Sequence, residues 1–194
     1  MSYSKRGKPV VSIQQPSVAY FCMEFGLHES FPIYSGGLGI LAGDIMKAAR
    51  DQERALVGIG ILWDEGYTIQ KIDSDGKPYD VFVKTTREYL TPLEPRVTLT
   101  LRGQDVELRA WEVNQFGSNP LVLLEPVKEE HRHFTSRLYN GDRLAQELIL
   151  GVGGVRMLRA LELDVRLYHF NEGHALFAGF ELLREEVAQG ASLA

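Results

Sequence analysis

The chain has 194 residues, of which 44% are hydrophobic and 24% are charged, and its formal net charge is −5. This composition is typical of a soluble globular protein, and the negative charge argues against nucleic-acid binding, which needs clustered lysine and arginine. No apolar run approaches the ~20 residues of a membrane helix, and the polar N-terminus shows no signal peptide, so we expect a cytoplasmic protein without membrane contact.

The first third of the chain predicts the beginning of an α/β unit. Residues 1–17 are polar and predict a flexible N-terminal arm. The apolar residues 18–23 predict a buried strand, and the single cysteine within it, Cys22, excludes an internal disulfide and a cysteine-based zinc site. We expect Cys22 to be buried. After a glycine-rich turn, apolar residues recur at helical spacing from residue 40, and residues 55–63 predict a second strand.

The middle of the chain predicts two β-hairpins, because short alternating segments flank turn residues. The first hairpin has strands at residues 67–72 and 79–83, and the second has strands at residues 97–101 and 106–113. A further short strand is predicted at residues 121–124. We interpret this region as an antiparallel β insertion within an α/β frame.

The last third of the chain returns to an α/β pattern. A long helix is predicted at residues 142–163, followed by a strand at 165–170 and a helix at 175–187. Three glycines interrupt the long helix, at positions 151, 153 and 154. Each costs about 1 kcal/mol relative to alanine in a helix interior, so we expect close packing or a break in the backbone there.

Ser35-Gly36-Gly37-Leu38-Gly39 opens the first helix. The first N–H groups of a helix lack intrahelical partners, and glycine lets the backbone approach an anion, so this loop could hold a phosphate or sugar phosphate. The alternative is a tight turn without a ligand. Gly37, Gly39 and Ala42 also fit a dinucleotide-binding pattern, but that pattern normally follows its strand at once, which disfavours it here.

Polar side chains follow the predicted strands. Glu24 follows the first strand, and in open α/β sheets ligands bind at the carboxyl ends of strands, so Glu24 could line a pocket or order the loop. We expect His28 to make a loop hydrogen bond. Asn171, Glu172 and His174 follow the last strand and could bind sugar hydroxyls, although Asn171 is also a good helix N-cap.

Two further pairs of residues carry weaker signals. Asp64 and Glu65 follow the strand at residues 55–63 and could line the same rim as Glu24. His131 and His133 have no carboxylate partner at metal-ligand spacing, so we expect both on the surface.

Several motifs in order along the chain resemble the α-glucan phosphorylases, especially their compact bacterial type. The first two, YFCMEFGLHES at residues 20–30 and PIYSGGLGILAGD at 32–44, are the most specific. The other matching segments are LVGIGIL (56–62), LYNGD (138–142), GVGGVR (151–156) and HFNEGH (169–174).

The resemblance implies a Rossmann-like domain of a GT-B glycosyltransferase over residues 18–190, with the β-hairpin insertion. It implies transfer of glucosyl groups from α-1,4-glucan ends to phosphate, giving glucose 1-phosphate. In such enzymes the backbone at the positions of Gly37 and Leu38 lies against phosphate and sugar, and the residue matching Glu24 lines the sugar site. Around them, the resemblance implies substrate contacts at Gly36, Gly39, Asn171, Glu172 and His174.

Pyridoxal phosphate is the cofactor that the resemblance implies. The lysine that carries it lies in a C-terminal domain whose motif we do not find in this sequence. We therefore expect the chain to lack that domain, to be inactive alone, and to pair with the missing domain or form a homodimer. A nucleotide-sugar glucan synthase of the same architecture and a non-catalytic module that binds glucan or a partner are the alternatives.

Overall fold

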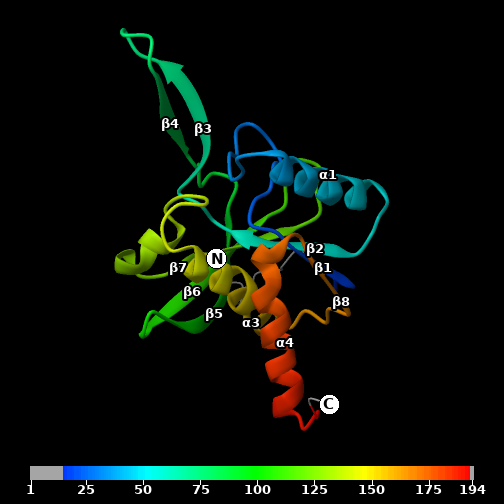
Figure 1. Cartoon of the computed structure of the whole chain (residues 1–194). Coiled ribbons are helices and arrows are strands. Elements are labelled where there is room, and N and C mark those ends of the chain that lie inside the picture. Colours follow the sequence, from blue (N-terminus) through cyan, green and yellow to red (C-terminus); the bar gives the residue numbers. More distant parts are fainter. Residues whose placement is uncertain (1–14, 193–194) are drawn as a thin grey trace, which may run out of the picture.

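The computed structural model describes residues 15–192 and contains a six-stranded mixed sheet in the order β5-β6-β7-β2-β1-β8 (Figure 1). The predicted arm at residues 1–17 lies outside the described part except for its last residues, 15–17. The strands of the sheet are β1 (Val18–Phe21), β2 (Leu56–Ile61), β5 (Thr91–Leu101), β6 (Gln104–Val113), β7 (Leu121–Pro126) and β8 (Leu167–Phe170).

The four strands β7, β2, β1 and β8 are parallel, as the α/β pattern predicts. The chain moves from β1 outward to β2 and β7, and later returns to the other side of β1 as β8. Phe21 at the end of β1 pairs with Ile59 of β2 on one side and Phe170 of β8 on the other. The strand order therefore reverses between β1 and β8, which is where ligands bind in open α/β sheets.

The second predicted hairpin is antiparallel as expected, and it joins the main sheet, which the sequence pattern did not predict. Its strands, β5 and β6, pair antiparallel and extend the main sheet through β7. Val106, Leu108 and Ala110 alternate along β6 and are buried, so one face of this hairpin belongs to the core.

Only the first predicted hairpin stands apart from the main sheet. It consists of β3 (Glu65–Ile72) and β4 (Pro78–Lys84) and projects from the body of the molecule (Figure 1). Its turn contains Gly76 at φ 77°, in the left-handed region that glycine adopts without strain.

Helices cover both faces of the sheet. On one face lies α1 (Gly37–Asp51), and a Cβ at Gly58 of β2 would lie 2.9 Å from the Met46 side chain of this helix. On the other face lies α3 (Gly154–Ala160), where a Cβ at Gly154 would lie 2.7 Å from Ile59. Because residues 58 and 59 are consecutive in a strand, they point to opposite faces.

The predicted long helix is one helical run with a π-helical turn inside it. It comprises α2 (Arg143–Leu148), η2 (Ile149–Gly153) and α3, and it packs against α4 (Leu176–Ala188). A Cβ at Gly151 would lie 2.5 Å from the backbone nitrogen of Ala178 in α4. The expectation that these glycines permit close packing is confirmed.

Two short 3-10 helices complete the secondary structure of the described residues: η1 (Glu129–Thr135) and η3 (Gly173–Ala175). Within residues 15–192, none of the helices combines the length and hydrophobicity that crossing a membrane requires.

Candidate functional site

The candidate site lies where the strand order reverses. Glu24 follows β1 and Asn171 follows β8, and these strands are neighbours in the sheet. The N–H of Asn171 donates to the carbonyl of Phe21, which continues the pairing one residue beyond the strands. The topology thus brings together two segments that the sequence singled out separately.

Glu24 is the centre of a hydrogen-bond network, and only 2% of its surface is exposed. Its Oε2 accepts from the backbone N–H groups of Ser35 (2.6 Å) and Gly36 (3.1 Å). Its Oε1 accepts from the hydroxyl of Tyr139 at 2.6 Å. A carboxylate can accept about four hydrogen bonds, so it has room for one more donor, such as a ligand hydroxyl. Glu24 therefore fixes the glycine loop to the segment that contains Tyr139.

The glycine loop presents its next two backbone N–H groups outward. Gly37 and Leu38 begin α1, and their N–H groups find no backbone or side-chain acceptor among the described residues. A Cβ at Gly36 or Gly37 would have no neighbour within 4 Å, so this side of the loop is open. The N-terminus of a helix with free N–H groups favours an anion. The N–H of Gly36 is already bound to Glu24, which leaves Gly37 and Leu38 as the free donors.

Gly39 has a packing role that the expected substrate contact does not explain. It is buried, and a Cβ there would lie 2.8 Å from Oε2 of Glu24 and still closer to Tyr34. Its carbonyl accepts from the N–H of Gly26 at 2.7 Å. One turn later, a Cβ at Gly43 would collide with the backbone of Gly26. These glycines let the loop after β1 contact α1 backbone to backbone.

Asn171 does not cap a helix, contrary to one sequence interpretation, because α4 begins only at Leu176 with Ala175 at its N-cap. Its side chain is buried and its Nδ2 donates to the Tyr20 hydroxyl (2.8 Å) and to the sulfur of Cys22 (3.3 Å). Both amide donors are therefore used inside the protein. These bonds fix the segment after β8 to β1, and they leave neither donor available to a substrate.

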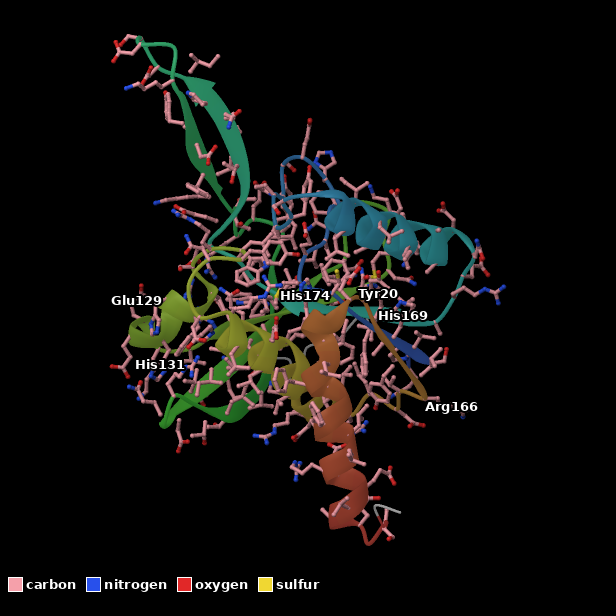
Figure 2. All side chains as sticks on the ribbon, viewed as in Figure 1. Tyr20, Glu129, His131, Arg166, His169 and His174 are labelled. Atoms are coloured by element: carbon pink, nitrogen blue, oxygen red, sulfur yellow. The ribbon has the colours of Figure 1, made fainter. Side chains whose placement is uncertain are left out.

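Cys22 and Tyr20, which accept the hydrogen bonds of Asn171, are both buried. Both are at most 1% exposed, and burial raises the pKa of the Cys22 thiol to about 11 and raises that of the Tyr20 hydroxyl. The Tyr20 ring also stacks on His169 of β8, with ring centres 4.8 Å apart (Figure 2). The expected burial of Cys22 is confirmed.

Two non-glycine residues of the site have positive φ. Glu172 has φ 63° and ψ 179°, and Tyr139 has φ 59°. Such conformations cost on the order of 1–3 kcal/mol and tend to occur at functional sites. The Glu172 side chain is exposed, whereas the Tyr139 hydroxyl reaches Glu24. Burial and the hydrogen bond to Glu24 raise the pKa of Tyr139, so its proton stays on the phenol.

His174 lies in η3, at the start of the final helix (Figure 2). Its ring centre is 5.6 Å from that of Tyr139. Burial, followed by the positive charge of Arg143, lowers the pKa of His174, so the imidazole is neutral near pH 7. Its Nδ1 is buried and has no hydrogen-bond partner among residues 15–192. His174 therefore lies beside Tyr139 with one buried nitrogen that has no hydrogen-bond partner among residues 15–192.

Sequence reasoning missed Tyr139 and Arg143 as members of the site. The Arg143 guanidinium lies 4.4 Å from the centre of the Tyr139 ring and is paired with Glu147 at 2.9 Å. Tyr139 belongs to the LYNGD motif that carried the resemblance, so a signal was present. What the sequence could not supply was the contact with Glu24, because it joins residues 115 positions apart.

The remaining candidates lie outside this network. Nδ1 of His28 accepts from the N–H of Ser30 at 3.2 Å, so the expected loop hydrogen bond is confirmed. The surface prediction is wrong for His131, which is only 4% exposed because η1 packs on β7. The same prediction is confirmed for His133, which is exposed. Asp64 and Glu65 line a neighbouring cavity together with Asn140.

The lysines do not fit the cofactor that the resemblance implies. A lysine that forms a Schiff base is usually desolvated in a fitted pocket. None of the lysines within the described residues is buried. These are Lys47, Lys71, Lys77, Lys84 and Lys128. The described residues therefore offer no attachment point of that kind for pyridoxal phosphate.

Curated relatives match most of this chain. A maltodextrin phosphorylase of Thermococcus litoralis is 38% identical over 205 residues, covering 97% of this chain and 24% of that protein. A glycogen phosphorylase of Mycobacterium tuberculosis is 40% identical over 192 residues, covering 88% of this chain and 22% of that protein. The chain thus spans about a quarter of the length of these relatives. No protein-family model matches the chain.

Among solved structures, the catalytic domain of starch synthase IV from Arabidopsis thaliana, bound to ADP and acarbose, has a TM-score of 0.65 at 14% identity. The match covers 91% of this chain and 32% of that one, and at this identity it speaks for the fold alone. The predicted α/β fold of a GT-B glycosyltransferase domain is confirmed. The curated relatives confirm what the motifs predicted: over most of its length, this chain is similar to the α-glucan phosphorylases.

Proposed function

We propose that this chain is the substrate-side part of an α-glucan phosphorylase, which transfers a glucosyl group from the end of an α-1,4-glucan to phosphate. The observation that carries the proposal is the Glu24 network. A single buried carboxylate holds the glycine loop through Ser35 and Gly36 and holds Tyr139 on its other oxygen. The free N–H groups of Gly37 and Leu38 then face an open side of the loop.

The reaction places specific demands on these groups. The bond between C1 of the terminal glucose and O4 of the next unit breaks, a phosphate oxygen bonds to C1, and O4 takes up a proton. Negative charge is concentrated on phosphate, and preorganised N–H donors at a helix N-terminus stabilise such charge. Gly37 and Leu38 supply these donors. Glu24 orients the loop, and its remaining lone pair can accept a sugar hydroxyl.

The side chains after β8 would bind the sugar or support those that do. His174 is neutral near pH 7 and has a free Nδ1, so it can exchange a hydrogen bond with a hydroxyl. The strained backbone at Glu172 sets the direction in which η3 leaves the sheet. Asn171 acts indirectly, by tying this segment to Tyr20.

The cofactor and the second half of the active site are proposed to come from elsewhere. Pyridoxal phosphate supplies its phosphate group for proton transfer in the enzymes that this chain resembles. Because the described lysines are not buried, we propose that this chain does not bind the cofactor as a Schiff base. The cleft of a GT-B enzyme is also made of two domains, so this chain alone should be inactive.

An exposed apolar stripe on α4 is the proposed contact with a partner. Leu176, Phe180, Leu183 and Val187 recur at helical spacing and are 41–55% exposed. Exposed apolar stripes of this kind commonly mark an interface. For the isolated chain we propose a second copy as the occupant, because a stripe along one helix can pair with itself about a two-fold axis.

The function is tested by restoring the missing part. The chain should be fused to the part of the Thermococcus litoralis maltodextrin phosphorylase that it does not match, and glucose 1-phosphate release from maltodextrin measured. We expect activity from the fusion and none from the chain alone. Glu24→Gln in the fusion should lower turnover by ~10² or more, because the loop donors lose their fixed position.

A matched control is Glu29→Gln, an exposed carboxylate in the same loop region that the network does not use. It should leave turnover unchanged. Turnover by the chain alone, or a folded fusion that Glu24→Gln does not slow, would contradict the proposal. Saturable binding of ADP-glucose or UDP-glucose to the chain would favour the synthase alternative, and maltodextrin binding by an inactive but folded fusion would favour the non-catalytic one.

A further inference from the structure

Asparagine followed by glycine occurs once in this chain, at Asn140 and Gly141. The pair lies between Tyr139, which binds Glu24, and α2, which begins at Arg143. The other three asparagines, at positions 114, 119 and 171, are followed by glutamine, proline and glutamate. Asparagine is a chemically labile residue, and glycine crowds its side chain least because it has no Cβ. The pair therefore marks the asparagine of this chain most open to a spontaneous covalent change.

The structure leaves the atoms of this pair free to react. Asn140 is exposed, and its side-chain amide makes no hydrogen bond within residues 15–192. The backbone N–H of Gly141 also has no acceptor in the part of the chain that the structure describes. A Cβ at Gly141 would meet nothing within 4 Å, so no neighbouring group crowds the peptide between the two residues. Both residues line a cavity of about 680 Å³ that opens to solvent, so water reaches them.

The backbone around the pair belongs to no helix or strand. Tyr139 has φ 59° and Gly141 has φ 86°. The N–H of Asn140 donates to the carbonyl of Arg137 at 3.3 Å, and the Asn140 carbonyl accepts from Nε2 of Gln146 at 2.7 Å. These bonds hold the main chain of Asn140 but not its side chain, which is free to rotate about χ1 toward the nitrogen of Gly141.

Three other positions that contain the same kinds of group are protected. Nδ2 of Asn171 has two acceptors inside the protein, and Nδ2 of Asn119 donates to a backbone carbonyl at 2.9 Å. Asn119 also precedes proline, whose nitrogen carries no hydrogen to lose. Aspartate before glycine forms the same ring as asparagine, and this pair occurs at Asp75 and Gly76. There, however, the N–H of Gly76 donates to the carbonyl of Asp73 at 3.1 Å.

We propose that Asn140 is a site of spontaneous deamidation that produces isoaspartate. The nitrogen of Gly141 bonds to Cγ of Asn140, and Nδ2 leaves as ammonia together with the proton of the Gly141 N–H. Water then opens the five-membered succinimide ring. Cleavage between the ring nitrogen and Cγ gives aspartate, and cleavage between that nitrogen and the main-chain carbonyl carbon gives isoaspartate. Asparagine and water thus become a carboxylic acid and ammonia. The reaction needs no substrate, so it does not depend on the proposed function.

Isoaspartate would change how the main chain is held at this place. The chain then runs through Cβ and Cγ of residue 140, which adds a carbon atom between Tyr139 and Asp142. The carbonyl that binds Gln146 becomes part of a free carboxylate, so this bond no longer holds the peptide that leads to Gly141. Asp142 stays attached to Arg102 through two hydrogen bonds, at 2.6 and 2.8 Å.

The hydroxyl of Tyr139 is the attachment on the other side of the modified residue, through its bond to Glu24 at 2.6 Å. The turn that presents Tyr139 closes with the bond from Asn140 to Arg137. Because the link from this turn to Asp142 becomes longer and loses the support of Gln146, we expect the bond between Tyr139 and Glu24 to weaken. The modification would therefore loosen the Glu24 network without touching it.

The test is to incubate the folded full chain for several weeks in neutral buffer, well below its melting temperature. We expect the intact mass to rise by the difference between an NH₂ and an OH group, and the change to map to the peptide that contains Asn140. An isoaspartyl methyltransferase should label the incubated chain. Asn140→Gln should abolish both signals, because glutamine would have to form a six-membered ring. Asn114→Gln, at an exposed asparagine without a following glycine, is the matched control and should react like the parent chain.

A parallel incubation in urea shows whether the fold permits the reaction. A mass increase in urea but not in the folded chain would show that the native turn protects Asn140, and would overturn the proposal. Isoaspartate that persists undiminished in Asn140→Gln would place the reaction at Asp75 and would overturn it too. The incubated chain should also unfold at a lower urea concentration than the fresh chain, whereas fresh and incubated Asn140→Gln should not differ. An unchanged midpoint after complete reaction would contradict the weakening of the bond between Tyr139 and Glu24.

Discussion

The hydroxyl of Tyr139 donates a 2.6 Å hydrogen bond to Oε1 of Glu24, which joins the loop after β1 to the segment before α2. Tyr139→Phe removes this donor and leaves a buried carboxylate oxygen short of a partner, while the ring can stay beside His174. We expect a loss of about 1–3 kcal/mol in the free energy of unfolding, measured with urea. Tyr79→Phe, on the exposed hairpin, should change it by less than ~0.5 kcal/mol. Equal effects of both variants would contradict the role of this bond.

Alanine at Gly37 and at Gly39 should have opposite consequences for stability. A Cβ at Gly37 meets nothing within 4 Å, so Gly37→Ala should leave the melting temperature unchanged or slightly higher. Gly39→Ala places a Cβ against Tyr34 and Glu24 and should cost about 1–3 kcal/mol. In the active fusion, Gly37→Ala should slow turnover if the loop binds phosphate, because the added Cβ lies on the open side from which the anion would approach the backbone. Normal turnover by the folded Gly37→Ala variant would contradict phosphate binding by the loop and favour a tight turn without a ligand.

Glu181 makes stability depend on pH in the acid range. Hydrogen bonds from Arg184 and then Arg156 lower its pKa from 4.5 to about 2. The stability that it contributes is therefore complete above about pH 4.5 and is lost as the pH falls toward 2. Allowing for solvent at the exposed Arg184, we expect a loss on the order of 2 kcal/mol. Urea titrations at pH 5 and pH 2.5 should show a smaller difference for Glu181→Gln, and an unchanged difference would refute this assignment.

The apolar stripe on α4 should make the isolated chain self-associate. Sedimentation velocity at rising concentration should show a dimer, and Phe180→Lys should shift the chain to monomer because it places a charge within the interface. Ile72→Lys is the control, since Ile72 is 72% exposed on the hairpin and away from α4. A monomer at all concentrations, or an equal response to Ile72→Lys, would argue against the stripe.

The thiol of Cys22 should be unreactive in the native protein. It is fully buried, and burial raises its pKa to about 11, so very little thiolate exists at pH 8. Ellman's reagent should release almost no colour from the folded chain and one equivalent in urea. Rapid reaction without denaturant would show that Cys22 becomes exposed readily in the native protein, and would contradict this prediction.

Local patterns predicted the individual elements well and their long-range pairing less well. The α/β order, both hairpins and the helix that begins near residue 40 all appear in the fold. The joining of the second hairpin to the main sheet was not predicted, because alternation in a strand does not say which strand pairs with its other edge. Val106 and Leu108 alternate with polar residues, which indicated a buried face, but only the pairing of β6 with β7 shows where that face lies.

The same limit applies to the candidate site. Glu24 and the glycine loop were found from their position after a strand and before a helix, which depends on local order alone. The hydrogen bonds of Tyr139 to Glu24 and of Asn171 to Tyr20 each join residues more than 100 positions apart, so no local pattern predicts them. His131 was expected outside, because a short polar helix such as η1 gives little sign of which side it packs.

The attachment of two loop amides to Glu24 has a consequence for the motions of the chain. Amide hydrogens in loops usually exchange with solvent within seconds to minutes, but those of Ser35 and Gly36 are bound to a carboxylate that is only 2% exposed. They can exchange only when the glycine loop separates from Glu24. Deuterium uptake at these two amides would then report how often the loop leaves Glu24, and it should be slower than at loop amides that face solvent.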